Sequence, residues 1–193
     1  MSLDHAILGF VNERARSGYD LKKAFDATVA HIWPAKQSQI YLTLARMNRA
    51  GLVELRVVQQ DGKPNRKVYH ITEAGLEELR RWLACPLPLP PVRDAFLVQM
   101  TWADSIETHE ITGLIDAWET AHRERLEECR KYLCKLEWNP PKGRWGRVLI
   151  PLIVEQLIMI EDTSLRWATT AKNSVKAMLP PEGDEGHQAE NET

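Results

Sequence analysis

Four of the seven residues from Cys85 to Pro91 are proline, and this stretch constrains the fold more than any other part of the chain. Proline fixes φ and lacks an amide donor, so the stretch can form neither a helix nor a central strand. We expect a stiff linker at residues 85–91 between two modules, residues 1–84 and 92–179. The polar, acidic residues 180–193 are expected to be disordered.

The first module begins with three short helical patterns. Apolar residues recur at helical spacing over residues 3–15, and a second helix follows Ser17, which can form a capping box with Asp20. A third helix is expected to begin within residues 35–38. It ends before Gly51, because glycine is the typical residue just after a helix C-terminus.

A short β-hairpin and a fourth helix complete this module. Residues 52–58 and 66–71 are rich in strand-forming residues, and turn-forming residues separate them. Thr72 then caps a helix over residues 73–83. Three helices, a hairpin and a helix, in that order, predict a winged helix-turn-helix domain, whose third helix would enter the major groove of DNA.

The second module carries helical patterns throughout. A short amphipathic helix is expected over residues 93–103, followed by a long helix that is capped by Asp104 or Ser105 and runs to about Trp138. A second long helix is expected over residues 145–178. The predicted fold is therefore mainly α with one small β-hairpin: an N-terminal winged helix-turn-helix domain and a C-terminal long-helix dimerisation domain.

The two long helices carry more apolar surface than one helical hairpin can bury. Residues 148–160, VLIPLIVEQLIMI, are apolar nearly all round, which implies burial on more than one side. These helices pack either on the first module or on a second copy of the chain. We favour the second copy, and hence a homodimer, because the proline-rich linker separates the modules. The residues expected at the dimer interface are Leu114, Trp118, Leu126, Leu133, Leu152, Leu157 and Trp167.

The net charge of −2 conceals an uneven distribution. Residues 1–84 hold 13 Lys and Arg against 9 Asp and Glu, a net of +4, whereas residues 85–193 hold 12 against 18, a net of −6. Residues 28–72 alone hold 7 basic residues against 2 acidic ones. This distribution favours an anionic partner for the first module, with double-stranded DNA the leading candidate. Taken alone, the charge distribution is more often explained by chance scatter.

The outward face of the predicted third helix is polar. Glutamine can bond adenine through two hydrogen bonds, and an arginine further along the helix suits a DNA phosphate. Leu42 lies off the buried stripe, and we expect it either to pack on the hairpin, which is the favoured alternative, or to contact a thymine methyl group. The alternative for the whole face is an ordinary solvated surface. The residues expected to contact DNA from this helix are Lys36, Gln37, Ser38, Gln39, Thr43, Arg46 and Arg49.

The turn of the predicted hairpin concentrates positive charge at a narrow tip. Lys63, Arg66 and Lys67 flank the turn together with Asn65, and such a hairpin can follow a minor groove or a phosphate strand. Taken alone, this tip could equally be a solubilising loop. The basic tip and the polar third helix together indicate a DNA-binding surface more specifically than either does alone.

Five of the seven tryptophans lie beyond the linker, and two of them, Trp102 and Trp118, are candidates for lining a pocket for a small aromatic effector. The favoured alternative is that these rings are plain core. Charged residues of the long helices, such as His122–Arg125, alternate in sign as on a solvated face. The sequence carries no nucleophile elbow, P-loop or metal-ligand spacing, so we expect no catalytic residues, no metal and no cofactor.

The cysteines and the hydropathy indicate a reducing compartment. Cys85, Cys129 and Cys134 are too few and too irregularly placed for a disulfide framework, and a redox switch is the less favoured alternative. The sequence shows no secretory signal and no apolar run long enough to span a membrane. We therefore expect a cytoplasmic protein without a membrane partner.

Several segments, in their order along the chain, resemble those of one family of regulators. The segments are AILGF (6–10), SGYDLKK (17–23), QIYLTL (39–44), GLV (51–53) and GKPNRKVYHITEAG (62–75). They resemble the start, the recognition helix and the wing of PadR-like transcriptional regulators. The extended helical second module is similar in layout to the long form of that family, the subgroup that includes the virulence activator AphA.

The resemblance implies a homodimer that binds a pseudo-palindromic operator, usually as a repressor. It implies that Tyr41 packs at the start of the recognition helix, among the DNA-contact residues, and that the tip from Lys63 to Lys67 lies on DNA. Some relatives bind phenolic acids or flat aromatic drugs between their C-terminal helices. This chain has Lys36 where relatives often have a capping serine, so its recognition helix could instead begin at Ser38.

We therefore interpret the chain as a sequence-specific DNA-binding transcriptional regulator. The alternative is a winged-helix protein-interaction module that does not bind DNA. An enzyme that uses the tryptophan-rich second module is disfavoured, because the sequence shows no acid–base or nucleophile arrangement.

Overall fold

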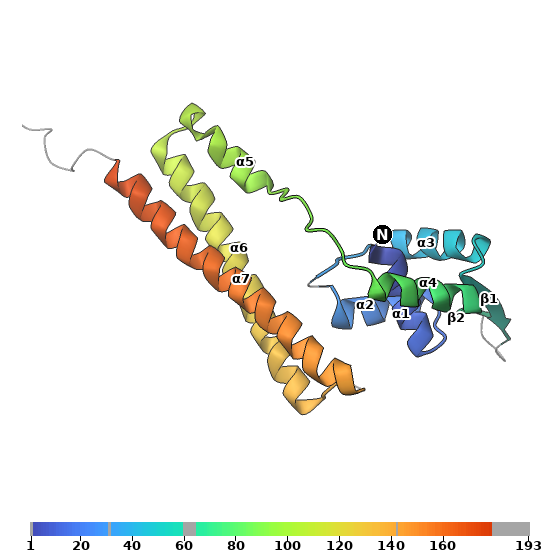
Figure 1. Ribbon diagram of the computed structural model, residues 1–193. Coiled ribbons are helices and arrows are strands. Elements are labelled where there is room, and N and C mark those ends of the chain that lie inside the picture. The colour runs from blue at the N-terminus through green and yellow to red at the C-terminus, as the bar shows by residue number, and fades with distance from the viewer. Residues whose placement is uncertain (1, 31, 60–64, 142, 179–193) are drawn as a thin grey trace, which may run out of the picture. The chain divides into compact units, whose positions relative to one another are not determined.

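The computed structural model describes residues 2–30, 32–59, 65–141 and 143–178 of the chain. The chain divides into two compact units, Met1–Pro90 and Pro91–Thr193 (Figure 1). The division falls in the proline-rich stretch.

The first unit combines a bundle of helices with a two-stranded wing. Its elements in chain order are α1 (Ser2–Glu13), α2 (Gly18–Thr28), α3 (Gln37–Arg49), β1 (Val53–Val58), β2 (Arg66–Ile71) and α4 (Glu73–Ala84). The two strands are antiparallel, with Val53 opposite Ile71 and Val58 opposite Arg66. This is the order of elements that the sequence predicts for a winged helix-turn-helix.

One apolar core joins the helices of the first unit. Ile7 of α1, Phe25 of α2, and Ile40 and Leu44 of α3 are almost completely buried in it. A side chain of this size contributes roughly 1.5–3 kcal/mol when fully buried. Because Ile40 and Leu44 lie on the same side of α3, their burial turns the opposite side of the helix outward.

The ends of the helices follow the sequence signals. The Ser17 hydroxyl accepts a hydrogen bond from the amide of Asp20, and the Asp20 carboxylate accepts one from the amide of Ser17, both at 3.2 Å. Thr72 caps α4 by accepting from the amide of Gly75 at 3.1 Å. Gly51 has a φ of +71°, the left-handed conformation that glycine adopts just after a helix. These predicted caps are confirmed.

Hydrogen bonds fix the wing to the helices. The amide of Arg16, between α1 and α2, donates to the carbonyl of Tyr69 in β2 at 3.2 Å, and the amide of Tyr69 donates back at 2.8 Å. The side-chain oxygen of Asn48, near the end of α3, accepts from the amide of Leu55 in β1 at 3.0 Å. The wing is thereby held at both ends of the helix-turn-helix.

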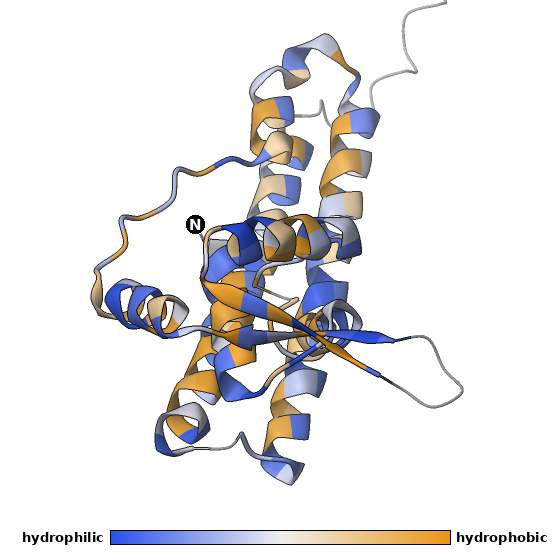
Figure 2. Ribbon diagram, turned by 90° about the vertical axis from the view of Figure 1, so that its right-hand side faces the viewer, coloured by the Kyte–Doolittle hydropathy of each residue, from blue (hydrophilic) through white to orange (hydrophobic). Residues whose placement is uncertain are grey.

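The second unit is a helical hairpin preceded by a short helix. Its elements are α5 (Ala95–Thr101), a 3-10 turn (Ala103–Ser105), α6 (Thr108–Trp138) and α7 (Arg144–Ala177). The two long helices pack along each other, and hydrophobic residues recur along both of them (Figure 2). No helix in the described ranges is long and apolar enough to cross a membrane.

The predicted cap of the first long helix is wrong. Asp104 and Ser105 lie in the 3-10 turn, and α6 begins at Thr108. The carboxylate of Glu110 accepts a hydrogen bond from the amide of Glu107 at 2.9 Å. This bond satisfies a backbone donor at the helix start, and α6 therefore begins later than the sequence signal suggests.

Gly75 allows α4 to lie close to the backbone just before β1. A Cβ atom on Gly75 would lie 2.0 Å from the backbone oxygen of Leu52, so a larger residue would force the two segments apart. We expect Gly75→Ala to lower the free energy of unfolding by about 1–3 kcal/mol, measured by urea denaturation.

Gly9→Ala is the matched control for this prediction. Gly9 lies inside α1, and a Cβ atom there meets no other atom within 4 Å, so alanine should preserve or raise the stability. Equal stability of the two variants would contradict the close approach of α4.

Candidate nucleic-acid interface

The outward face of α3 is an exposed stripe of polar residues with one leucine. Ser38, Gln39, Arg46 and Arg49 are exposed and share this side of the helix with Leu42. Leu42 is 71% exposed, so the packing on the hairpin considered from the sequence does not occur. The side of α3 that faces away from the core is therefore polar and basic, with one apolar side chain at its centre.

The first turn of α3 is held by one of the expected base-contact residues. The helix begins at Gln37, with Lys36 as its N-cap residue, and therefore not at Ser38. The side-chain oxygen of Gln39 accepts a hydrogen bond from the amide of Lys36 at 2.8 Å. A two-bond contact between Gln39 and adenine uses this same oxygen, so the contact must share the oxygen's second lone pair with the cap or replace the cap.

The prediction that Thr43 contacts DNA is wrong, because only 7% of this residue is exposed. Thr43 lies three residues after Ile40 and four before Met47, which are both in the core. Helical spacing therefore places Thr43 at the edge of the buried stripe. Its polar hydroxyl suggests an exposed residue, but its position in the helix determines its burial.

The ring of Tyr41 packs on the first residue of α2. A Cβ atom on Gly18 would lie 2.5 Å from Cε1 and 2.7 Å from Cζ of Tyr41, so the absence of a side chain at Gly18 permits this contact. The ring stays partly exposed. The contact joins α2 to the recognition helix at the position that the family resemblance gives to Tyr41.

Two arginines that the sequence assigns to DNA are ion-paired within the first unit. Arg46 of α3 pairs with Asp4 of α1, and Arg66 of β2 pairs with Asp20 of α2. Arg49 instead donates to the carbonyl oxygen one turn back at 3.4 Å. Neither carboxylate could be identified from the sequence as a partner of the site, because each pair joins residues more than 40 positions apart.

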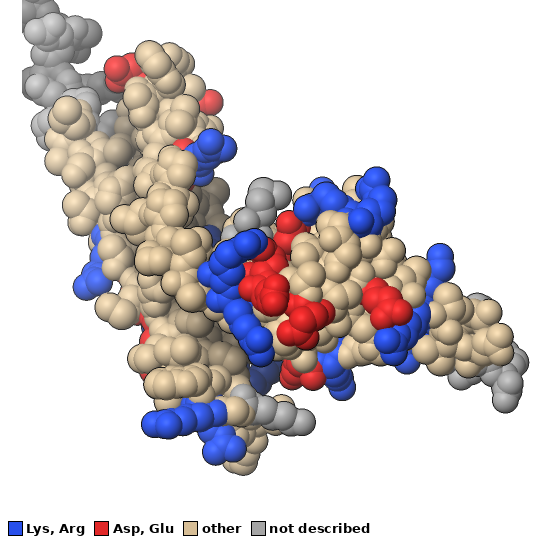
Figure 3. Space-filling model, turned by 45° about the vertical axis from the view of Figure 1, so that its right-hand side comes forward, with Lys and Arg blue, Asp and Glu red and all other residues tan. Residues whose placement is uncertain are grey.

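The described part of the wing tip is basic and exposed. Asn65, Arg66 and Lys67 have exposed side chains, and Lys63 lies outside the described residues. On the face drawn in Figure 3, the Lys and Arg side chains of the first unit are interspersed with Asp and Glu side chains. Basic and acidic groups therefore share this surface.

Asp20 is held in its charged form. The Ser17 hydroxyl donates a hydrogen bond to Asp20 Oδ2 at 2.6 Å, and the Arg66 guanidinium pairs with the same oxygen. The hydrogen bond from Ser17, followed by the hydrogen bond and charge of Arg66, lowers the pKa of Asp20 below its ordinary value of 3.8, although partial burial acts in the opposite direction. Asp20 therefore offers a charged carboxylate to Arg66 at neutral pH.

Aromatic rings gather in the second unit, where α5 meets the long helices. Phe96 of α5 stacks on Trp118 of α6 with ring centroids 5.0 Å apart, and Trp167 of α7 packs edge-on against Trp118 at 5.1 Å. Trp102 is 74% exposed and has no ring contact with these residues in the described part of the chain. The structure therefore groups Trp118 with Phe96 and Trp167 and does not bring it together with Trp102.

The prediction that His122–Arg125 form a solvated face is wrong for His122, whose side chain is only 14% exposed, whereas Arg125 stays exposed while its guanidinium reaches a partner on α7. Glu161 of α7 is 1% exposed, and its carboxylate lies 2.5 Å from His122 Nδ1 and 3.0 Å from Arg125 Nη2. A buried carboxylate requires such partners, because leaving it unpaired would cost about 3–5 kcal/mol. The sequence pattern of α6 alone could not indicate a partner on α7.

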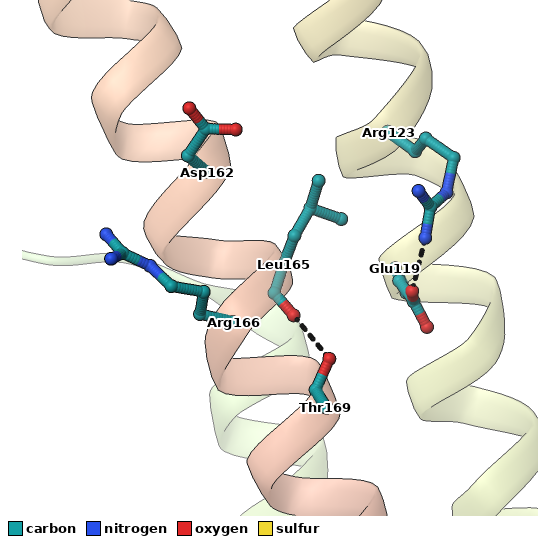
Figure 4. A pocket seen from close by; sticks show the side chains of 6 residues that line it. All are labelled: Glu119, Arg123, Asp162, Leu165, Arg166 and Thr169. Atoms are coloured by element: carbon teal, nitrogen blue, oxygen red, sulfur yellow. Dashed lines mark hydrogen bonds and ion pairs between the residues drawn. The ribbon is translucent and has the colours of Figure 1, made fainter.

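A hollow between α6 and α7 is lined mainly by polar and charged side chains. Glu119 and Arg123 of α6, joined by a 2.6 Å hydrogen bond, face Leu165 and Thr169 of α7 (Figure 4). The lining residues are Glu119, Arg123, Asp162, Leu165, Arg166 and Thr169. With a single aliphatic side chain and no tryptophan, this hollow lacks the character of a pocket for an aromatic ligand.

The residues expected at a dimer interface differ in exposure. Leu126 is buried within the chain, which corrects its assignment to an interface. Leu114, Trp118, Leu133 and Leu157 are half-buried. Leu152 and Trp167 are exposed, and α7 exposes further apolar residues, namely Trp145, Val148, Leu149, Ile153, Met159 and Ile160.

The cysteines are free, with Cys85 and Cys134 exposed and Cys129 buried. Burial, and then the nearby charge of Glu161, raises the pKa of the Cys129 thiol, which disfavours its reactive thiolate form. Within the described ranges, no group of three or more His, Cys, Asp and Glu residues is arranged to hold a metal ion.

A winged helix-turn-helix unit joined to a unit built on a long helical hairpin is the architecture of a class of winged-helix transcriptional regulators. Residues 7–81 match the transcriptional regulator PadR-like family, and residues 92–176 match the virulence activator alpha C-terminal family. The chain therefore carries the N-terminal domain of the PadR-like transcriptional regulators, followed by this C-terminal domain.

Two relatives match over more than half of the chain. It is 42% identical over 105 residues to the Mycobacterium tuberculosis protein named "Probable transcriptional regulator Rv1176c" and 33% identical over 113 residues to the Bacillus subtilis protein named "Negative transcriptional regulator PadR". These matches cover 54% and 58% of this chain. They span 56% and 62% of the relatives' own lengths.

Solved structures of similar proteins share the fold over nearly the whole chain. Bacillus subtilis PadR in complex with operator DNA has a TM-score of 0.77 at 26% identity, covering 91% of this chain and 99% of that one. The Vibrio cholerae virulence activator AphA has a TM-score of 0.74 at 26% identity, covering 92% of this chain and 100% of that one.

Because the pKa of Asp20 is lowered in the folded chain, we expect its contribution to the free energy of unfolding to depend on pH. A carboxyl group whose pKa is lower in the folded than in the unfolded chain stabilises the fold above its unfolded value, and this stabilisation is lost as the pH falls through the folded value. We expect Asp20→Asn to lower the free energy of unfolding by about 0.3–1 kcal/mol at neutral pH. The difference from wild type should shrink once the pH falls below 3.8, measured by urea denaturation at several pH values.

Asp26→Asn, on the same helix, is the control. Asp26 pairs with Lys22, one turn earlier in α2, and not with a residue of another element. A difference between wild type and Asp20→Asn that stays constant from neutral pH to pH 3 would contradict the electrostatic role given to Asp20.

Proposed function

We propose that this chain is a homodimeric DNA-binding regulator whose α3 enters the major groove and whose wing contacts the phosphate backbone. The observation that carries the proposal is the outward stripe of α3, where Gln39, Leu42, Arg46 and Arg49 are exposed on one side of a rigidly packed helix. The fold shared with a relative solved in complex with operator DNA supports the same interpretation.

The proposed contacts divide between base edges and phosphates. The first turn of α3 reaches the bases, Leu42 meets a thymine methyl group, and Tyr41 lies beside them. The arginines further along α3 and the wing contact phosphates, which gives affinity without sequence preference. The proposed contact residues are Lys36, Gln37, Ser38, Gln39, Tyr41, Leu42, Arg46, Arg49, Lys63, Asn65, Arg66 and Lys67.

The homodimer is proposed from the apolar surface that α7 leaves exposed. Leu152 and Trp167 lie on that helix together with six further exposed apolar residues. A surface of this kind marks an interaction site rather than a free face. In a dimer, two copies of α3 would enter successive major grooves about 34 Å apart, which suits a pseudo-palindromic operator.

Repression in response to a small aromatic effector is the proposed mode of regulation. One relative is named a negative transcriptional regulator, and its structure has also been solved with p-coumaric acid. In this chain, the cluster of Phe96, Trp118 and Trp167 is the aromatic surface that suits a flat effector. An aromatic effector should therefore quench tryptophan fluorescence.

Two substitutions on α3 should separate base contacts from phosphate contacts. We expect Gln39→Ala to lose about 1–3 kcal/mol of preference for the operator over a scrambled duplex. Arg49→Ala should weaken both duplexes alike and reduce the slope of log K against log salt by about one unit per protomer. Fluorescence anisotropy measures both effects.

Arg80→Ala, the loss of an exposed charge on α4, is the control for Arg49. If Arg80→Ala and Arg49→Ala changed the salt slope equally, the reduced slope would reflect net charge alone and the placement of Arg49 on DNA would be wrong.

A charge placed on the exposed apolar side of α7 should oppose the proposed dimer. We expect Leu152→Glu to weaken dimerisation at least about tenfold, since burying an unpaired carboxylate costs more than 1.4 kcal/mol. Size-exclusion chromatography with light scattering follows the dimer. Asn173→Glu places the same charge at an exposed polar position of α7 and should leave the dimer intact. A wild-type chain that is monomeric at micromolar concentration would contradict the proposal.

A further inference from the structure

Two of the cations on the proposed DNA surface are already occupied by carboxylates of the same chain. Arg46 Nη2 pairs with Asp4 Oδ1, and Arg66 Nη2 pairs with Asp20 Oδ2. The two pairs come from separate places, since one joins α3 to α1 and the other joins the wing to α2. The same arrangement therefore occurs independently on both basic elements of the surface.

In each pair the aspartate is fixed more firmly than the arginine. The side chain of Asp4 is 16% exposed against 53% for Arg46, and that of Asp20 is 30% exposed against 47% for Arg66. Asp20 is further held by the amide and the hydroxyl of Ser17, at 3.2 and 2.6 Å. The guanidinium groups are thus the members of each pair that can turn to another partner.

A DNA phosphate competes for these groups on equal chemical terms. Carboxylate and phosphate oxygens bind a guanidinium in the same charge-assisted geometry, so the Nη2 atom that donates to an aspartate cannot fully serve a phosphate. Two other proposed contacts, Arg49 and Lys67, have no carboxylate partner in the described part of the chain. The surface therefore combines cations that are paired with a carboxylate and cations that are not.

We propose that Asp4 and Asp20 limit the DNA affinity of this regulator, because Arg46 and Arg66 must exchange an aspartate for a phosphate when DNA binds. This inference rests on the proposed DNA-binding function. Each exchange leaves a carboxylate without its arginine beside the phosphate backbone, where it repels the phosphates and attracts a cation. The uptake of that cation offsets part of the cation release that drives binding, so the exchange both weakens binding and flattens its salt dependence.

The exchange takes place on DNA of any sequence. Its cost should therefore be the same for an operator and for a scrambled duplex, while the base contacts of α3 distinguish the two. Asp4 and Asp20 thus reduce the time spent on non-specific DNA without changing the ratio of specific to non-specific affinity.

The test uses the full chain with Asp4→Asn, Asp20→Asn and the control Asp26→Asn. Asparagine keeps the shape and one oxygen of aspartate, and all three variants lose the same charge. Asp26 pairs with Lys22 on its own helix rather than with an arginine of the proposed surface. Anisotropy titrations use one duplex from upstream of the gene and one scrambled duplex, each at several salt concentrations.

We expect Asp4→Asn and Asp20→Asn each to bind both duplexes about three- to tenfold more tightly than wild type. The salt slope should steepen by up to about one unit per protomer, and the ratio of the two affinities should stay unchanged. Asp26→Asn should stay within about twofold of wild type, because it removes a screened charge and releases no arginine of the proposed surface.

A double-mutant cycle separates release of an arginine from a general change in charge. If Asp20 acts through Arg66, Asp20→Asn should give no gain in affinity when Arg66→Ala is also present, and the same should hold for Asp4→Asn with Arg46→Ala. A gain that survives in the arginine variants would overturn the proposal. Should Asp20→Asn lose too much helix capping to fold, the Asp4 cycle decides the question, because Asp4 does not belong to that capping box.

The outcomes distinguish this inference from the function on which it rests. If wild type prefers the upstream duplex while Asp4→Asn and Asp20→Asn bind no more tightly than Asp26→Asn, the inference is wrong and the proposed function stands. Weaker binding by both variants would mean that the aspartates orient the arginines for phosphate, which also overturns the inference. If neither wild type nor any variant binds either duplex, the proposed function fails and the inference fails with it.

Discussion

The burial of one side of α3 is the constraint on which the rest of the first unit depends. Ile40, Leu44 and Met47 have no exposed surface, and the geometry of a helix then determines where every other side chain of α3 lies. The capping box of α2, the contact of Gly18 with Tyr41, and the hydrogen-bonded wing all hold this orientation. A surface that distinguishes base pairs needs such rigidity, since its side chains must be held within about 0.5 Å of their contacts.

Local signals explain which parts of this fold could be predicted from the sequence. Caps, the glycine after α3 and the proline-rich linker each act within a few residues, and the predicted elements follow from them. Thr43 is an exception: its polarity suggests an exposed DNA contact, but its position in the helix buries it. The start of α6 is a second exception, because the carboxylate of Glu110, and not Asp104 or Ser105, accepts a hydrogen bond from a backbone amide at the start of the helix. The pairs Arg46–Asp4 and Arg125–Glu161 join distant segments, so no local pattern records them.

The second unit places a charged group where a simple hairpin would have an apolar one. Glu161 is buried with His122 and Arg125, which specifies how α6 and α7 align more narrowly than apolar contacts would. Phe96 adds α5 to the hairpin through Trp118 and Trp167. One side of α7 remains apolar and exposed, so a single copy of the chain leaves this surface uncovered. These features support an assembly role for the unit, separate from the polar face of α3.

The most direct test of the central claim is the binding of the wild-type chain to two DNA duplexes. Fluorescence anisotropy compares a fragment from upstream of the protein's own gene with a scrambled fragment of the same composition, at two salt concentrations. The account predicts tighter binding to the upstream fragment and an affinity that falls steeply as salt rises. Equal and weak binding of both fragments, unchanged by salt, would contradict the claim that α3 and the wing form a DNA-binding surface.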